Sequence, residues 1–167
     1  MGSMQLSPAP VWSTSMKTVL TYGTFDLFHV GHVNMLERAR ACGDRLIVGV
    51  STDEFNQIKG KKAIIPYMHR AAIVLNSKSV DSVFPEDTWE QKVTDIKKYH
   101  ADVFVMGADW EGKFDHLTDL CQVVYLPRTE GVSSTELRAR LAPLNTSRLA
   151  ELKLALETVA AIAGELQ

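Results

Sequence analysis

Short apolar runs rich in β-branched residues alternate along this chain with segments of helical periodicity, and this alternation constrains the fold most. Such runs are typical of strands buried on both faces of a parallel sheet, whose crossovers are usually helices. The spacing predicts an open, doubly wound α/β fold with a five-stranded parallel sheet and flanking helices. The expected strands are 18–22, 46–50, 80–84, 103–106 and 122–126, the expected helices are 30–42, 66–76, 88–99 and 133–142, and 52–65 is an expected polar loop.

The two ends of the chain differ in pattern from its middle. Residues 1–16 indicate a tag remnant and a flexible leader, with Met-Gly-Ser-Met followed by prolines and hydroxyl residues. Residues 17–143 are expected to form one domain. Within 144–167, leucines and other apolar residues recur at steps of three and four, which predicts an amphipathic C-terminal helix. This helix packs on its own domain, against a partner subunit or against a region of the protein outside this sequence, and the sequence leaves these interpretations open.

Composition excludes several classes of partner. The formal net charge is −2, so bulk attraction to nucleic acid or to anionic lipid is not expected. No apolar run reaches the roughly 18 residues that a membrane-spanning helix needs, so no membrane insertion is expected. The two cysteines, Cys42 and Cys121, lack metal-ligand spacing and suit free thiols in a reducing cytoplasm.

The segment from Tyr22 to His32 carries the strongest indication of chemistry. It reads Tyr-Gly-Thr-Phe-Asp-Leu-Phe-His-Val-Gly-His and joins the first expected strand to the first expected helix. A helix N-terminus offers free backbone N–H groups and suits a phosphate chain. His29 and His32 can both face one phosphate from the first turn, and Gly31 allows close approach to the backbone. In the alternative interpretation one histidine caps the helix and the other is exposed.

A second anion site is predicted in the segment from Arg128 to Thr135, which reads Arg-Thr-Glu-Gly-Val-Ser-Ser-Thr. An arginine, hydroxyls and a glycine in a loop that enters a helix can hold an anion. Ser133 and Glu136 also have the spacing of a capping box, which explains them without any ligand. Ser133 can cap the helix and line a phosphate site, so the two interpretations are compatible.

Three further segments offer recognition groups, each with a plainer alternative. Lys59 and Lys61 belong to a basic loop that can close over a triphosphate or stay solvated. Arg70 lies in an otherwise apolar helix, where an arginine either reaches the surface or binds a phosphate or carboxylate. A loop after the fourth strand holds Asp109 and Trp110, which suits either base recognition or an ordinary surface loop.

Together these segments resemble the glycerol-3-phosphate cytidylyltransferase family, a branch of the nucleotidyltransferases that carry an HxGH signature. The resemblance covers residues 17–141, about three-quarters of the chain. It rests on Leu-Thr-Tyr-Gly-Thr-Phe-Asp at 20–26, Ser-Thr-Asp-Glu-Phe-Asn at 51–56, His-Arg at 69–70, Trp-Glu-Gln-Lys at 89–92, Asp-Val-Phe-Val-Met-Gly at 102–107, Asp-Trp-Glu-Gly-Lys-Phe at 109–114 and Val-Val-Tyr-Leu-Pro-Arg-Thr-Glu-Gly at 123–131. The last two strings are particular to the glycerol-phosphate branch.

The resemblance implies a Rossmann-like fold and a role for each matching residue. Catalysis would fall to His29, His32, Arg128 and Lys59. Asp53, Arg70 and Trp89 would bind or organise the substrate. No side chain is assigned to a metal, and Mg²⁺ would arrive with CTP. The residues expected to bind the nucleotide are Tyr22, Gly23, Thr24, Phe25, Asp26, Gly31, Lys61, Asp109, Arg128, Thr129, Gly131, Ser133 and Ser134.

The implied reaction transfers CMP from CTP to sn-glycerol 3-phosphate and yields CDP-glycerol for polymers such as teichoic acid or capsule. The family also implies a cytoplasmic homodimer with the HxGH region near its interface. Two positions depart from the family pattern, Ala108 for a common Asp and Ser134 for a common Thr, and the first alters the charge of its loop. Alternatives are a relative that uses ethanolamine phosphate, another polyol phosphate or ATP, and a non-catalytic nucleotide-binding assembly module.

Overall fold

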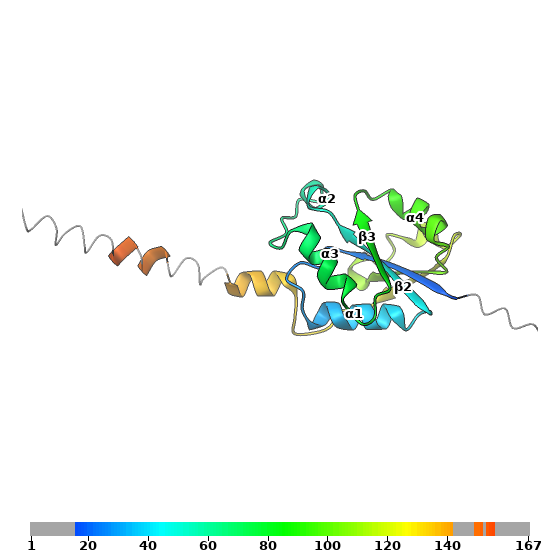
Figure 1. The fold of residues 1–167 in the computed structure, drawn as a ribbon, viewed down its shortest axis with the longest axis horizontal. Coiled ribbons are helices and arrows are strands. Elements are labelled where there is room, and N and C mark those ends of the chain that lie inside the picture. Colours follow the sequence, from blue (N-terminus) through cyan, green and yellow to red (C-terminus); the bar gives the residue numbers. More distant parts are fainter. Residues whose placement is uncertain (1–15, 142–148, 152, 156–167) are drawn as a thin grey trace, which may run out of the picture.

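Five parallel strands form one sheet in the order β3-β2-β1-β4-β5, which confirms the predicted doubly wound α/β fold (Figure 1). The computed structural model describes residues 16–141, 149–151 and 153–155. The strands are β1 (Thr18–Gly23), β2 (Arg45–Ser51), β3 (Ser82–Glu86), β4 (Val103–Gly107) and β5 (Gln122–Leu126). The helices are α1 (Val30–Arg40), α2 (Asp53–Ile58), α3 (Tyr67–Leu75) and α4 (Gln91–Tyr99), with 3₁₀ turns η1 (Ala108–Trp110) and η2 (Asp115–Leu117) and a further helical segment at 134–141.

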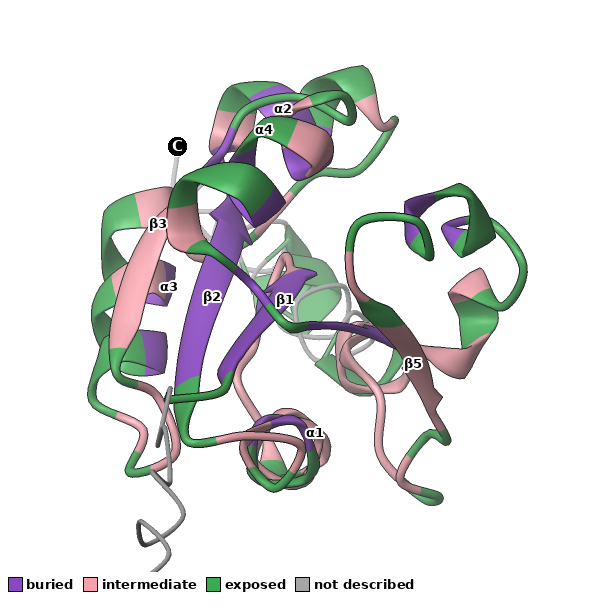
Figure 2. Ribbon diagram, turned by 90° about the vertical axis from the view of Figure 1, so that its right-hand side faces the viewer, coloured by how far each residue is buried: buried purple, intermediate pink, exposed green. Residues whose placement is uncertain are grey.

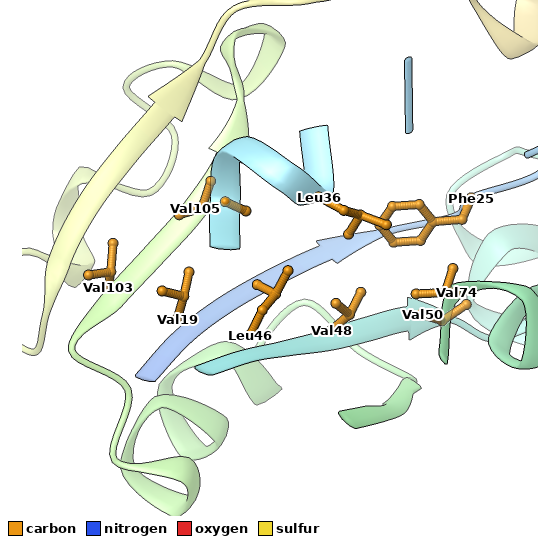
Figure 3. Packing of buried hydrophobic residues seen from close by; sticks show 10 residues of the cluster. Val19, Phe25, Leu36, Leu46, Val48, Val50, Val74, Val103 and Val105 are labelled. Atoms are coloured by element: carbon orange, nitrogen blue, oxygen red, sulfur yellow. The ribbon is translucent and has the colours of Figure 1, made fainter. Parts of the chain in front are cut away.

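Side chains that alternate along the strands build a core on each face of the sheet. On one face Val19, Leu46 and Val103 pack with Leu36 of α1 and Val74 of α3 (Figure 3). On the other face the neighbours of these strand residues pack with α4 and the 3₁₀ turns; they include Leu20, Ile47 and Phe104. The central strands β1 and β2 are buried on both faces, as Figure 2 shows, which explains why they read as continuous apolar runs.

The predicted polar loop over 52–65 is wrong in its first half, because residues 53–58 form the short helix α2. The Thr52 hydroxyl caps this helix by accepting a hydrogen bond from the Phe55 backbone N–H at 3.2 Å. Asp53 and Glu54 lie in its first turn, where acidic residues are favourable. The Thr-Asp-Glu sequence was therefore an available helix-start signal.

Two other predicted bounds need correction. The third strand begins at Ser82 instead of 80 and continues through Pro85, which the sheet tolerates because β3 is an edge strand. The helix expected from residue 88 begins at Gln91, whose backbone N–H is capped by the Thr88 hydroxyl at 3.2 Å. The remaining strands were predicted to within about two residues.

The predictions for the two ends of the chain concern residues that the structure describes only in small part. Most of the leader and most of the predicted C-terminal helix lie outside the described residues, although residues 149–151 and 153–155 are helical. Within the described part of the chain no helix is long and apolar enough to cross a membrane. Cys42 and Cys121 are free and partly buried.

Any side chain larger than that of Gly49 in β2 is expected to destabilise the fold. A Cβ at this position would lie 2.3 Å from Cδ1 of Tyr22 and 3.1 Å from Cζ of Phe84, so a ring would have to move. Overpacking of this kind typically costs about 1–3 kcal/mol. We predict that Gly49→Ala lowers the free energy of unfolding by that amount, measured by chemical denaturation.

Gly107 of β4 provides the matched control. A Cβ there would meet nothing within 4 Å, so Gly107→Ala should leave stability nearly unchanged. An equal loss of stability in the two variants would show that steric conflict with Tyr22 is not the reason for glycine at position 49.

Candidate functional site

A cavity of about 480 Å³ lies beyond the carboxyl ends of β1, β4 and β5. The strand order changes direction between β1 and β4, and ligands of open α/β sheets bind at such a switch point. The predicted site residues that line this cavity are Tyr22, Gly23, Thr24, Phe25, Asp26, His29, Gly31, His32, Lys61, Asp109, Arg128, Thr129, Ser133 and Ser134.

The two histidines begin α1 as a reciprocal cap. Nδ1 of His29 accepts a hydrogen bond from the Gly31 backbone N–H at 3.0 Å. Nδ1 of His32 accepts one from the His29 backbone N–H at 3.3 Å. The rings are stacked, with centroids 4.0 Å apart and planes inclined by 26°. The structural and chemical interpretations of these histidines are therefore compatible, because capping uses only one nitrogen of each ring.

This cap fixes the tautomer of both neutral imidazoles. A nitrogen that accepts a backbone N–H cannot itself carry a proton, so in the neutral ring the proton is on Nε2. Each histidine is thus left with an Nε2–H donor at the N-terminus of α1. Nε2 of His29 lies 3.4 Å from the Ser134 hydroxyl, so this donor adjoins the second predicted cradle.

Burial keeps both imidazoles in the neutral form near pH 7. Desolvation lowers the pKa of His29. Desolvation, and then the neighbouring His29, lower the pKa of His32 to about 4. A bound polyanion would raise both pKa values by stabilising the imidazolium form.

The depressed pKa of His32 predicts a pH dependence of stability. The folded chain protonates His32 only near pH 4, whereas an unfolded histidine takes its proton near pH 6.5. Between these values the unfolded chain binds more protons, so His32 makes the free energy of unfolding fall as the pH falls. We predict that His32→Gln flattens this dependence between pH 6.5 and 4, measured by urea denaturation.

His69, an exposed histidine of α3, supplies the control substitution. His69→Gln should retain the slope of the unmodified protein. If His32→Gln shows that same slope, burial of a neutral His32 is contradicted.

Asp26 holds the loop that carries Lys61. Its carboxylate accepts hydrogen bonds from the backbone N–H groups of Ile64 and Ile65, both at 2.9 Å, and pairs with Arg138. Burial acts to raise the pKa of this carboxyl, but those two hydrogen bonds and the Arg138 charge outweigh it, and the pKa is lowered. Asp26 is therefore a charged anchor under the pocket, although it is only 2% exposed.

The second cradle is built on the helical segment 134–141. The Ser133 hydroxyl accepts a hydrogen bond from the Glu136 N–H at 3.0 Å, so Ser133 caps this helix as the spacing predicted. The Ser134 hydroxyl donates to the Asp26 carbonyl at 2.7 Å, which ties the helix to the turn after β1. Ser133 and Ser134 both line the cavity, so capping does not remove them from it.

Residues of α1 support the loop that precedes this helix. The Asn34 amide donates to the Thr129 hydroxyl at 3.3 Å, and Arg38 donates to the Pro127 carbonyl at 3.1 Å. Arg128 and Asp109 form an exposed ion pair in which Nε of Arg128 lies 2.7 Å from the carboxylate. Both members line the cavity. Because an exposed ion pair is weak, a bound ligand can break it and form its own contacts with Arg128 and Asp109.

Two predicted substrate-binding residues, Arg70 and Asp53, are bound to each other and to the protein backbone. Arg70 is completely buried, and its guanidinium donates to the carbonyls of Thr24, Ser51 and Ile65 and to Asp53. Neither Arg70 nor Asp53 lines the cavity. In this structure they position the strand ends, and direct contact with substrate stays a prediction.

Lys59 and Trp89 also lie outside the lining of this cavity. The Lys59 ammonium is 2.7 Å from the Ser51 hydroxyl, 3.6 Å from the Glu86 carboxylate and over the Trp89 ring. Burial lowers the pKa of Lys59 to about 8, against the opposing effect of Glu86. Gly131, likewise outside the lining, forms a turn with φ of 76°. The roles predicted for these residues remain untested.

Several lining residues were not named as site residues from the sequence. Leu126 and Pro127 extend the carboxyl end of β5, and Arg138 lies one helical turn after Ser134. That helical spacing was the available signal for Arg138. The other lining residues of this kind are Met35, Ala63, Gly107, Val132 and Thr135. Trp110, from the candidate recognition loop after the fourth strand, also lines the cavity.

The donor set of the cavity does not form a metal site. The carboxylates among its lining residues are Asp26 and Asp109, and each pairs with an arginine. Among the described residues no group of three or more His, Cys, Asp and Glu side chains is arranged to hold a metal ion. A divalent cation here would therefore be held chiefly by oxygens of the ligand.

Comparison with known proteins identifies relatives of this chain. Residues 20–140 match the cytidylyltransferase-like family. The glycerol-3-phosphate cytidylyltransferase of Bacillus subtilis (strain 168) is 58% identical over 129 residues, covering 77% of this chain and 100% of that protein. The enzyme of the same name from Staphylococcus aureus (strain NCTC 8325 / PS 47) is 55% identical over 126 residues, 75% of this chain and 96% of its own length.

A solved structure shows the same fold. The crystal structure of the lipopolysaccharide core biosynthesis protein from Thermoplasma volcanium GSS1 superposes with a TM-score of 0.59, over 69% of this chain and 99% of that one. Its sequence identity is 24%, so the likeness concerns the fold alone.

Proposed function

Since the chain belongs to the cytidylyltransferase-like family, we propose that it transfers CMP from CTP to sn-glycerol 3-phosphate, with release of CDP-glycerol and pyrophosphate. The acceptor follows from the relatives named for this activity, which the chain matches over nearly their whole length. The observation that carries the proposal is the stacked pair His29 and His32 at the start of α1. Both residues line the cavity, and Nε2 of His29 lies 3.4 Å from the Ser134 hydroxyl of the second cradle.

The proposed chemistry is an in-line displacement. A phosphate oxygen of glycerol 3-phosphate attacks the α-phosphorus of CTP, and the bond from this phosphorus to the β-phosphate oxygen breaks. The bond electrons leave with pyrophosphate, so no covalent enzyme intermediate forms. Negative charge grows on the α-phosphate oxygens in the transition state, and preorganised donors stabilise that charge.

His29 and His32 supply such donors. Because backbone N–H groups occupy both Nδ1 atoms, the rings cannot turn without breaking the cap of α1. The donors are therefore oriented before the substrate arrives, which is the condition for a large effect on the rate. The N-terminus of α1 adds its own partial positive charge at the same place.

The second cradle and the Lys61 loop would hold the remaining phosphates. Arg128, Ser133, Ser134 and Lys61 all line the cavity. Asp109 and Trp110 lie at the end of β4, where they can meet the nucleoside. Mg²⁺, carried by the phosphate oxygens of CTP, would offset part of their charge.

We also propose that the protein acts in the cytoplasm as a homodimer and supplies CDP-glycerol for glycerol-phosphate polymers such as teichoic acid or capsule. Support for the product comes from the relatives, which are named glycerol-3-phosphate cytidylyltransferases.

Loss of either imidazole should impair catalysis strongly. We predict that His29→Ala and His32→Ala each lower kcat by at least about 100-fold, the usual effect of removing one preorganised donor to a developing negative charge. Steady-state pyrophosphate release with saturating CTP and glycerol 3-phosphate measures this change.

A second substitution at position 29 separates catalysis from capping. Asn is a good N-cap residue, so His29→Asn should keep α1 stable while removing the Nε2–H donor. We predict that His29→Asn has nearly unchanged stability and the same loss of kcat, with His69→Ala as the unaffected control. Near-normal turnover in His29→Asn would contradict the proposed role of this imidazole.

The substrate assignment is tested with an acceptor panel. Pyrophosphate release is measured with CTP and Mg²⁺ for glycerol 3-phosphate, ethanolamine phosphate, choline phosphate, ribitol 5-phosphate and FMN, and with ATP in place of CTP. We expect release only with CTP and glycerol 3-phosphate. Release with a different acceptor or with ATP would overturn the substrate assignment, and CTP binding without release would support a non-catalytic module.

A further inference from the structure

Two segments that wall the nucleotide cavity meet at the side chain and backbone of Asp26, in the turn after β1. The loop with Lys61 meets it through the N–H groups of Ile64 and Ile65. The helix 134–141 meets it through the Ser134 hydroxyl, which binds the Asp26 carbonyl, and through Arg138, which pairs with the carboxylate. Ser134 and Arg138 are one helical turn apart, so a single face of this helix contacts Asp26.

The backbone around Asp26 is unusual. Both of its neighbours have positive φ, 52° at Phe25 and 49° at Leu27. Residues with a Cβ adopt this region at an energetic cost, and surrounding contacts must maintain it. The turn therefore directs a carboxylate inward at the expense of backbone strain, and the hydrogen bonds to Ile64 and Ile65 show what the carboxylate holds.

A buried carboxylate beside a triphosphate site is an electrostatic liability. Asp26 is 2% exposed and lines the cavity together with Arg138, so its charge is little screened by water. Without a cation it would repel CTP from a pocket otherwise rich in donors. Arg138 is the cation that faces it, from the helix that also carries Ser134.

We propose that Arg138 is a positioning residue of nucleotidyl transfer, which neutralises Asp26 and holds the second cradle against the Lys61 loop. This inference rests on the function proposed above. It requires Arg138 to favour binding of the triphosphate in particular, beyond any support it gives to the fold.

The test compares two nucleotides that differ in charge. Dissociation constants of CTP and CMP are measured by titration calorimetry for the unmodified chain, Arg138→Met and Arg138→Lys. Met keeps much of the aliphatic stem and removes the charge, whereas Lys keeps the charge. We expect Arg138→Met to weaken CTP about tenfold, equivalent to about 1.4 kcal/mol, and CMP much less. Arg138→Lys should restore most of the CTP affinity.

Arg140 of the same helix supplies the matched control. It forms an exposed i,i+4 pair with Glu136, and neither residue lines the cavity. Arg140→Gln should leave both dissociation constants unchanged. Arg138→Gln carries the same expectation as Arg138→Met and replaces it if that variant fails to fold by circular dichroism.

The outcomes separate this inference from the function on which it rests. If the unmodified chain binds CTP and turns it over, an unchanged CTP affinity in Arg138→Met, or an equal loss for CTP and CMP, overturns the role of Arg138 alone. If the unmodified chain binds neither nucleotide, the proposed function itself is overturned.

Discussion

The buried guanidinium of Arg70 is the interaction on which the arrangement of the site depends. It is fully buried and donates to the Thr24 carbonyl at 2.6 Å, the Ser51 carbonyl at 2.8 Å and the Ile65 carbonyl at 2.8 Å. Its ion pair with Asp53, at 2.6 Å, compensates the charge. A buried charge without such partners would be strongly destabilising, so these groups must stay together. The turn after β1, the end of β2, the start of α2 and the loop before α3 are thereby fixed relative to one another.

From this constraint the chemistry of the pocket follows in steps. With the turn after β1 held in place, Asp26 can anchor the Lys61 loop and the helix 134–141. The turn also places His29 at the start of α1, where capping selects the Nε2–H tautomer. Burial then keeps the imidazoles neutral, which the cap at Nδ1 requires. The site thus combines preorganised donors with two arginines that already have partners: Arg138 pairs with Asp26, and Arg128 pairs with Asp109.

The sequence was sufficient for the central strands β1 and β2 because they are buried on both faces, which leaves little ambiguity between strand and loop. It failed at α2, a six-residue helix too polar and too short to show periodicity, whose start is marked by the Thr52 cap and the acidic residues after it. It also misplaced β3, because Pro85 usually argues against a strand and is tolerated here only at the sheet edge. The misplacement of β3 depends on tertiary context, whereas α2 had a local signal in its cap and acidic first turn.

The sequence likewise predicted some residues of the candidate site correctly and left others undecided. Residues that follow β1 and β5 directly, such as His29 and Ser134, could be placed at the pocket because parallel strands end at one edge. Arg70 and Lys59 could not be placed from the sequence. A buried cation needs a partner, but its residue type does not show whether that partner is substrate or protein. The structure gives both of them protein partners, including Asp53 for Arg70 and Glu86 for Lys59.

The central claim is that two histidines present Nε2–H donors to the reacting phosphates of CTP. A crystal structure with CTP bound tests it most directly. The account predicts that α-phosphate oxygens lie within hydrogen-bond distance of Nε2 of His29 and of His32, while both Nδ1 atoms keep their backbone donors. Phosphates bound away from both rings, or imidazoles turned so that Nδ1 faces the ligand, would contradict it.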